Sequence, residues 1–126
     1  MIPVEISDAR YVSLTTYRKD GTPVATPVWA VEDGGELLVW TRDDAWKVKR
    51  LRRDKRVRVE VCDVRGRVAE GAPSAEGTGR VMETAELPRV RRALARKYGW
   101  QFRLTDLGGA LVRFGRRPHV GLAVSL

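Results

Sequence analysis

The sequence has very few of the residues that form disulfides or bind metals. Its 126 residues include one cysteine, Cys62, and one histidine, His119. A disulfide within the chain is therefore excluded, and a zinc site with four Cys or His ligands cannot be assembled. Long apolar runs are missing too: no stretch approaches the ~18 residues of a membrane span, and the first residues lack the apolar run of a secretory signal. We expect one domain, residues 1–126, in the cytoplasm, without a metal site or a membrane partner.

Motifs for catalysis by protein side chains are also missing. No Ser or Cys lies in a nucleophile elbow or a CxxC pair, and the chain has no GxGxxG or Walker loop. His119 follows a proline at the start of an expected strand, which favours a structural or exposed role. Asp43 and Asp44 are better explained as the start of a helix than as an acid–base pair. We predict no catalytic residue: if the protein is an enzyme, a bound cofactor supplies the reactive group.

What the sequence does have is positive charge. It contains 24 Lys and Arg against 16 Asp and Glu, a net charge of +8, which suits an anionic ligand or a nucleic acid. Nine of the cations fall between residues 42 and 58, and a second basic stretch covers residues 89–103. Only Trp46 interrupts the first stretch with an aromatic ring, so nucleic acid is the less favoured partner. A solvated helix face is the alternative explanation for either stretch.

The first half of the chain shows the alternation and β-branched residues typical of strands. Residues 11–17 predict a strand, after which Asp20-Gly21 predicts a tight hairpin turn. Residues 22–31 predict a second strand, in which Pro23 and Pro27 must lie at a strand start or an edge because proline has no N–H. A turn at residues 33–35 leads to a third strand over 36–41, so three strands in meander order are expected. Later strands are expected over residues 57–62, 76–83 and 119–125.

Helices are expected between these strands. The first begins at Asp43 or Asp44 and ends near Asp54. Another covers residues 85–98 and ends at Gly99, and a shorter one covers residues 101–114, while residues 64–75 predict a loop. Together, the strands, the Gly-rich turns and the lack of regular βαβ alternation predict a mainly β fold: a small six-stranded antiparallel barrel with helices at its ends.

The end of the third strand and the start of the basic helix together predict an anion site. The N–H groups at a helix start point outward, and Lys47 lies in the first turn, so a phosphate there would contact both. Lys49, Arg50 and Arg53 extend the positive field along the helix. The proline-containing strand would offer the amides of residues 28 and 29 to a flat heteroaromatic ligand. An ordinary barrel strand beside a solvated helix is the alternative.

A family resemblance is carried by the segment DGTPVATPVWAVEDGGELLVWTRDDAWKVKRLRRDKRVRVEVCD and continues through EGTGRVME, ARKYGWQFRLTDL and HVGLAVSL. The chain resembles the pyridoxamine 5'-phosphate oxidase-like split β-barrel proteins and is most similar to their actinobacterial flavin/deazaflavin oxidoreductase branch. The resemblance implies a six-stranded split-barrel homodimer with the cofactor in the groove between subunits. It also implies a coenzyme F420-dependent oxidoreductase, which transfers hydride between the reduced cofactor and an unsaturated or heteroaromatic small molecule.

The same resemblance implies which residues hold the cofactor. The positions it assigns to the ring, the phosphate and the phosphate with the anionic tail are, in that order, Thr26, Pro27 and Val28; Thr41, Arg42 and Lys47; and Lys49 and Arg50, with Arg53 beyond them. Trp29, Trp46 and the loop over residues 64–75 would contribute across the dimer interface.

Two departures from the family pattern bear on the cofactor. FMN-binding members carry a basic residue in the second strand, where residues 24–26 here are Val-Ala-Thr, so F420 is favoured over FMN. Trp46 stands where the family usually has a small residue, so it either stacks on a ligand or blocks the phosphate site. The alternatives are an FMN-binding protein and a haem or tetrapyrrole binder, for which His119 is the only conventional axial ligand. The sequence does not identify the physiological substrate or the role of residues 64–75.

Overall fold

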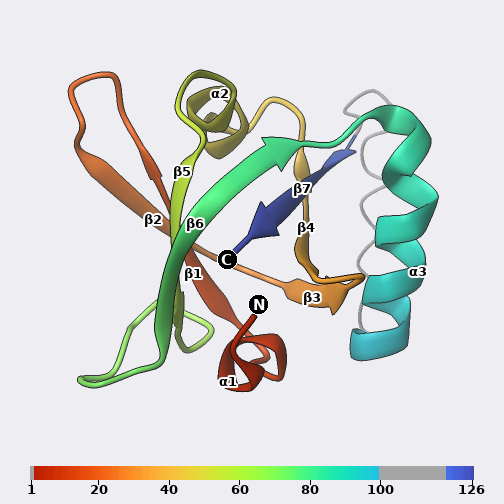
Figure 1. Cartoon of the computed structure of the whole chain (residues 1–126), viewed down its shortest axis with the longest axis horizontal. Helices are drawn as coiled ribbons and strands as arrows, with labels where there is room; N and C mark the ends of the chain where they lie inside the picture. Colours follow the sequence, from red (N-terminus) through yellow and green to blue (C-terminus); the bar gives the residue numbers. More distant parts are fainter. Residues whose placement is uncertain (1, 100–118) are drawn as a thin grey trace.

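The computed structural model describes residues 2–99 and 119–126 as one curled antiparallel sheet with helices on both of its faces (Figure 1). The strand order across the sheet is β2-β1-β5-β6-β7-β4-β3. The strands are β1 (Val12–Tyr17), β2 (Pro23–Val28), β3 (Ala30–Asp33), β4 (Glu36–Arg42), β5 (Arg56–Val61), β6 (Ser74–Val81) and β7 (His119–Ser125). The helices are α1 (Val4–Ser7), α2 (Trp46–Arg53), the 3-10 turn η1 (Thr84–Glu86) and α3 (Leu87–Tyr98). The mainly β split-barrel fold is confirmed, with seven strands rather than six.

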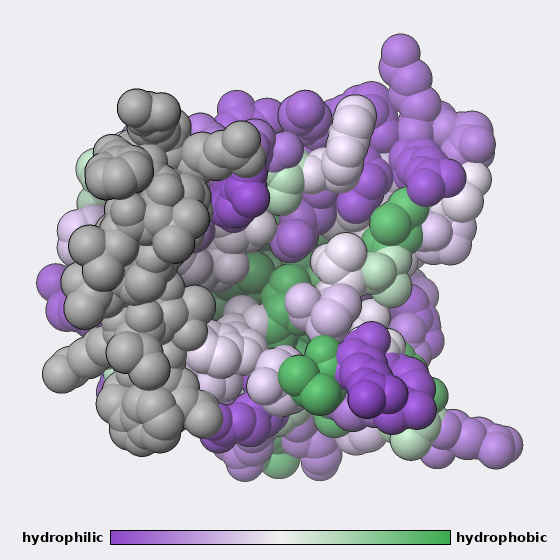
Figure 2. Space-filling model, turned by 180° about the vertical axis from the view of Figure 1, so that it is seen from behind, coloured by the Kyte–Doolittle hydropathy of each residue, from purple (hydrophilic) through white to green (hydrophobic). Residues whose placement is uncertain are grey.

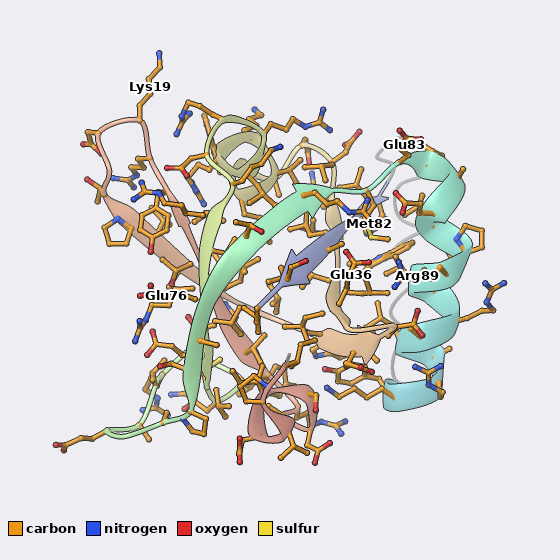
Figure 3. All side chains as sticks on the ribbon, in the orientation of Figure 1. Lys19, Glu36, Glu76, Met82, Glu83 and Arg89 are labelled. Atoms are coloured by element: carbon orange, nitrogen blue, oxygen red, sulfur yellow. The ribbon has the colours of Figure 1, made fainter. Side chains whose placement is uncertain are left out.

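The hairpin of β1 and β2 forms where the sequence predicts it. The N–H of Arg18 donates to the carbonyl of Thr22 at 2.9 Å, and the N–H of Thr22 donates to the Asp20 carboxylate at 2.9 Å. Gly21 has a φ of +88°, a left-handed conformation that glycine adopts without steric strain. The turn therefore holds Arg18 and Lys19 at the tip of the hairpin, and Lys19 projects away from the body of the molecule (Figure 3).

The strand expected over residues 22–31 is in fact two strands. β2 ends at Val28, β3 begins at Ala30, and they lie at opposite edges of the sheet, so the expected meander of three strands is wrong. Between them Trp29 stacks on Tyr98 of α3, with ring centroids 4.6 Å apart and an interplanar angle of 9°. Because a strongly curled sheet brings its two edges toward each other, one extended run passes from one edge to the other. This crossing between edges supplies the seventh strand.

Each face of the sheet carries its own hydrophobic cluster. The cluster enclosed by the sheet includes Leu14, Val59 and Leu122, and it receives Val48 and Leu51 from α2. The outer cluster consists of Val31, Leu38, Met82, Val90, Ala93, Leu94, Tyr98 and Ala123. α3 therefore covers the outside of the sheet, beside β3 and β4 in Figure 1, instead of closing an end of the barrel as expected. Only α2 packs its buried residues into the enclosed core from the end that carries the hairpin tip.

Cations of the second basic stretch fasten α3 to its neighbours. Arg89 pairs through Nε with Asp33 at 2.7 Å and through Nη1 with Glu36 at 3.1 Å, and Figure 3 shows Glu36 and Arg89 pointing toward each other. The Nζ of Lys97 donates to the backbone carbonyls of residues 7, 9 and 30 at 2.9, 2.7 and 2.6 Å. Gly99 ends the helix with a φ of +63°, as predicted. These contacts give Arg89 and Lys97 structural roles.

The start of α2 differs from the prediction. Its N-cap is Ala45, without a side-chain capping bond, so the prediction that Asp43 or Asp44 caps the helix is wrong. Asp44 instead pairs with Arg42 at 2.8 Å, because the guanidinium competes successfully for its carboxylate. The predicted end of the helix at Asp54 is confirmed. There the Asp54 carboxylate accepts hydrogen bonds from Arg56, which lowers the pKa of Asp54 to about 2.

Some expected features lie outside the described residues: the helix over residues 101–114 and the proline before the last strand. The short helix α1, by contrast, is an element that the periodicity of the sequence did not indicate. In residues 2–99 and 119–126, no helix is long and apolar enough to cross a membrane.

Candidate functional site

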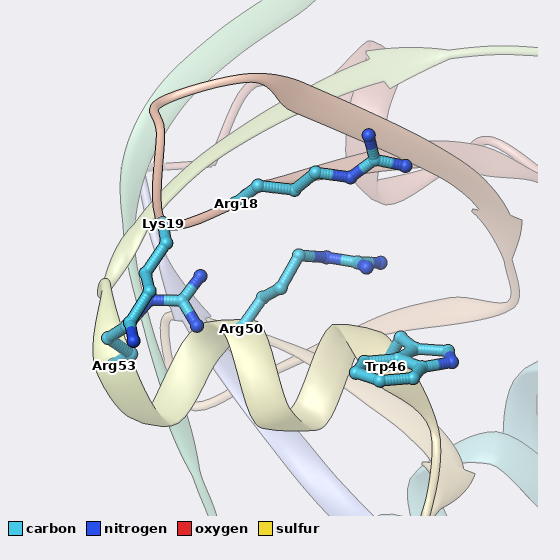
Figure 4. A pocket seen from close by; sticks show the side chains of 5 residues that line it. All are labelled: Arg18, Lys19, Trp46, Arg50 and Arg53. Atoms are coloured by element: carbon cyan, nitrogen blue, oxygen red, sulfur yellow. The ribbon is translucent and has the colours of Figure 1, made fainter.

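A cleft lies between the tip of the β1–β2 hairpin and α2. Its volume is about 350 Å³, and the described residues that line it are Arg18, Lys19, Trp46, Arg50 and Arg53; we call it the α2 cleft (Figure 4). Three of these residues come from α2 at spacings of four and three, which places them on one face of a helix. Hydrophilic side chains gather over the hairpin and α2 along the upper edge of the molecule seen from behind (Figure 2). The cleft is thus a strongly cationic depression with an aromatic wall.

Arg50 is the most unusual member of the cleft, because it is only 9% exposed. Its Nε donates to the hydroxyl of Thr16 in β1 at 2.8 Å, and in the part of the chain that the structure describes it forms no salt bridge with a carboxylate. Burial lowers the pKa of the Arg50 guanidinium, and the like charges of Arg18 and Arg53 lower it further. A buried cation without a counter-charge is destabilising, so the fold carries this charge without an internal reason.

Lys47 adds a second positive charge near Arg50. It lies three residues earlier in α2 and is half-buried. Burial lowers the pKa of Lys47, and the neighbouring charge of Arg50 lowers it as well. Two partly desolvated cations on adjacent turns, neither paired with a carboxylate among the described residues, form a preorganised place for an oxyanion.

Thr26 is the one buried side chain of the described residues whose polar atom, Oγ1, has no hydrogen-bond partner. In the β1–β2 ladder Thr26 pairs with Leu14, and the next pair on the same face joins Thr16 to Val24. Thr26 and Thr16 are therefore diagonal neighbours on the enclosed face of the sheet, about 7–8 Å apart. Since Thr16 accepts the hydrogen bond from Arg50, the unpaired hydroxyl of Thr26 lies near this guanidinium. We call Thr26, Lys47 and Arg50 the inner anion site.

The remaining residues predicted for the cofactor are not gathered at this point. Arg42 is engaged with Asp44, and the Nζ of Lys49 lies over the exposed ring of Trp46, 4.5 Å from its centroid. Thr41 is buried on β4, opposite Val120 of β7. The sequence thus indicated the correct helix and strand, but the structure brings only three of the eight predicted residues together.

Pro27 and Val28 face different surroundings. Pro27 pairs with Ser13 on the outer face, where the loop between β5 and β6 covers it: a Cβ at Gly66 would lie 3.3 Å from the Cδ of Pro27. Because Pro27 has no N–H, its pair with Ser13 is a non-hydrogen-bonded one, and the N–H of Val28 therefore points into the ladder toward Val12. The amide of Val28 is not offered to a ligand as we expected.

Sequence reasoning missed Arg18 and Lys19 as site residues. They stand in a hairpin turn about thirty residues before α2, and only the folding of the hairpin over the helix brings them to Arg50. The signal available in the sequence was the pair of cations directly before Asp20-Gly21, because a tight turn projects its neighbours together to one side.

His119 and Cys62 lie apart from this site. His119 pairs with Arg42 in the ladder and stacks on Trp40, with ring centroids 4.7 Å apart. Leu38, two residues from Trp40 on β4, belongs to the outer cluster, so His119 faces away from the enclosed side of the sheet. Burial raises the pKa of the Cys62 thiol, and Asp63 raises it further, which disfavours a reactive thiolate. In the described part of the chain, no group of three or more potential ligands could hold a metal ion.

Comparison with known proteins supports the fold and identifies the family. The model of the family described as pyridoxamine 5'-phosphate oxidase matches residues 4–119. Among solved structures, the heme storage protein HutZ of Vibrio cholerae is 12% identical, with a TM-score of 0.70, and 97% of this chain aligns with 84% of that chain. The conserved hypothetical protein Rv2991 of Mycobacterium tuberculosis is 29% identical, with a TM-score of 0.66, and 98% of this chain aligns with 79% of that chain.

An FAD-binding protein of Mesorhizobium loti is also similar: it is 16% identical, with a TM-score of 0.63, and 98% of this chain aligns with 84% of that chain. At their low identities, the V. cholerae and M. loti proteins establish similarity of fold alone. No protein with a curated description matches the sequence. The match over residues 4–119 and the curled sheet agree, and this chain belongs to the pyridoxamine 5'-phosphate oxidase family of split β-barrel proteins.

Proposed function

We propose that this protein binds coenzyme F420 at the inner anion site and is an oxidoreductase that transfers hydride between the reduced cofactor and an unsaturated or heteroaromatic small molecule. The observation that carries the proposal is the buried guanidinium of Arg50, which no carboxylate in the described part of the chain neutralises. The phosphate of a flavin-type cofactor is the counter-charge that this position lacks. Membership in a family named for an oxidase is consistent with redox chemistry.

The residues present fit such a group. Arg50 and Lys47 would hold the phosphate through charge-assisted hydrogen bonds, each contributing about 1.5–3 kcal/mol. The hydroxyl of Thr26, which has no protein partner, would bond to a polar atom of the cofactor at the neighbouring position of β2. A deazaflavin supplies the hydride from its own ring carbon, so the protein needs no nucleophile or metal of its own for that step. The tasks of this chain are then to bind, to orient and to exclude water.

F420 is preferred to FMN because β2 carries no cation at residues 24–26, where FMN-binding members hold the phosphate. Haem, which the V. cholerae protein stores, is the third ligand to compare. His119, the only conventional axial ligand, faces the outer side of the sheet and stacks on Trp40. A haem site at the inner anion site would therefore lack a histidine ligand. We propose in addition that the protein is a homodimer with the cofactor in the groove between subunits.

Titration of the purified protein with F420, FMN and haemin tests the proposal. We expect F420 to bind with a dissociation constant in the micromolar range or below, and FMN to bind at least about tenfold more weakly, a difference of about 1.4 kcal/mol. Binding should weaken as salt is raised, because the site is cationic. Arg52, an exposed arginine of α2 outside both sites, provides the matched control: Arg52→Ala should bind F420 like the wild type, and Arg50→Ala should not. Binding of FMN or haemin in preference to F420 would contradict the proposal.

A further inference from the structure

Trp46 is the most exposed large hydrophobic residue of the described chain, with 69% of its surface accessible. Solvent-exposed tryptophan at a cationic depression is typical of a surface that binds a ligand rather than one that packs internally. Figure 4 shows the ring at one end of the α2 cleft, and the guanidinium groups of Arg18 and Arg50 extend toward that end, one above the other. An aromatic wall and a pair of guanidinium groups thus meet at the same place.

The charges of the α2 cleft have no counter-charge within the described residues. Arg18, Lys19 and Arg53 are exposed and, like Arg50, form no salt bridge there; Arg53 donates only to the backbone carbonyl of Tyr17, at 3.1 Å. Each arginine can donate two parallel hydrogen bonds to a phosphate. The nearest acidic side chain in the sequence, Asp20, accepts its hydrogen bond from the N–H of Thr22 inside the turn. The cleft is therefore prepared for a phosphate that comes from outside the chain.

We propose that the α2 cleft is a second binding site, for small molecules that carry a planar aromatic ring next to a phosphate, with the ring stacked on Trp46 and the phosphate between Arg18 and Arg50. The cleft volume of about 350 Å³ lies within the range of small-molecule sites and suits a ligand of the size of a nucleoside monophosphate. Thr26 and Lys47 of the inner anion site do not line this cleft, so its occupation does not depend on the identity of the redox cofactor.

Three probes separate the contributions of the ring and the phosphate. Adenosine 5'-monophosphate carries both groups, adenosine carries the ring alone, and ribose 5-phosphate carries the phosphate alone. Titration calorimetry should show adenosine 5'-monophosphate binding at least about tenfold more tightly than either partial probe, because stacking and charge-assisted bonds each contribute on this scale. Equal binding of ribose 5-phosphate and adenosine 5'-monophosphate would overturn the assignment of Trp46, and no binding of adenosine 5'-monophosphate at millimolar concentration would overturn the site.

Substitutions then locate the binding. Trp46→Ala and Arg18→Ala should each weaken adenosine 5'-monophosphate binding about tenfold, whereas Trp46→Phe should retain most of the affinity, and Arg52→Ala should leave it within about twofold. Both substituted residues are exposed, so the thermal midpoint should not change. F420 affinity should be unaffected by Trp46→Ala; its loss in parallel with nucleotide affinity would show one site instead of two. A single-stranded oligonucleotide that binds much more tightly than its mononucleotide would identify a nucleic-acid groove and overturn the proposal.

Discussion

Replacing Arg50 by methionine should make the protein more stable and, at the same time, weaken its binding of F420. Methionine has a similar length and fills the space of the side-chain stem without a charge. The substitution removes a guanidinium that is 9% exposed and lacks a carboxylate partner in the described residues. It also removes the 2.8 Å hydrogen bond from Nε to the Thr16 hydroxyl.

The two consequences differ in sign and in size. Loss of a hydrogen bond from a charged donor costs about 1.5–3 kcal/mol. Removal of a buried, uncompensated charge gains several kcal/mol, and exchange of buried charges for apolar groups in other proteins has stabilised them by about 1–4 kcal/mol. We therefore expect the free energy of unfolding of Arg50→Met to rise by about 1–2 kcal/mol, which raises the thermal midpoint by about 3–5 °C in a chain of this size. F420 affinity should fall by about 1.5–3 kcal/mol, roughly 10- to 150-fold.

Urea denaturation of the cofactor-free protein and fluorescence titration with F420 measure the two quantities. Arg52→Met is the matched control, since Arg52 is exposed on the same helix and should change neither quantity by more than about 0.5 kcal/mol. A residue kept for function at the expense of stability moves the two measurements in opposite directions. If Arg50→Met instead destabilises the protein by more than about 1 kcal/mol and F420 binds as before, Arg50 is a structural residue and the inner anion site is misplaced.

Further expectations concern residues around the two sites. Thr26→Val should leave the thermal midpoint nearly unchanged, because Oγ1 has no partner to lose, but should weaken F420 binding about fivefold, as titration would show; a large drop in the midpoint would contradict this. The pKa of Asp54 is lowered to about 2 by hydrogen bonds from Arg56, so its contribution to stability is present above about pH 4 and is lost as the pH falls toward 2. Denaturation from pH 5 to 2 should be less pH-dependent in Asp54→Asn, and identical profiles would refute the role. Lys97→Met removes three hydrogen bonds to backbone carbonyls and should lower the free energy of unfolding by about 2–4 kcal/mol in urea denaturation, and an unchanged midpoint would show that these bonds are not stabilising.

Local patterns in the sequence were sufficient where the determining interactions span only a few residues. The turn at Asp20-Gly21 and the end of α3 at Gly99 were predicted because glycine adopts the left-handed conformation that each requires. Alternation likewise predicted β5 with Val57 and Val59 on the enclosed side. The capping of α2 was not predicted correctly, since Asp44 has the choice between the helix N–H groups and the neighbouring Arg42, and the geometry of the chain favours Arg42.

The candidate site shows the same division. The concentration of charge in residues 42–58 directed attention to α2, and the family resemblance directed it to β2, so Thr26, Lys47 and Arg50 were all named from the sequence. Their equivalence with the other predicted positions was misleading, because Lys49 and Arg42 have similar side chains but lie over Trp46 and beside Asp44. Burial and pairing distinguish these cations, and neither property is visible in a linear pattern.

By itself, then, the sequence determined the strand-rich class, the hairpins, the amphipathic helices and the excess of positive charge, since each depends on periodicity or on turn chemistry over a short stretch. Only the tertiary structure decided that the extended run through Trp29 divides between opposite edges of the sheet, and that Arg18 and Lys19 fold over α2. The physical reason is that strand pairing and the burial of a charge are properties of contacts between distant segments. The same arginine type is a solvated surface charge at residue 52 and a buried, unpaired one at residue 50 because only the latter faces β1.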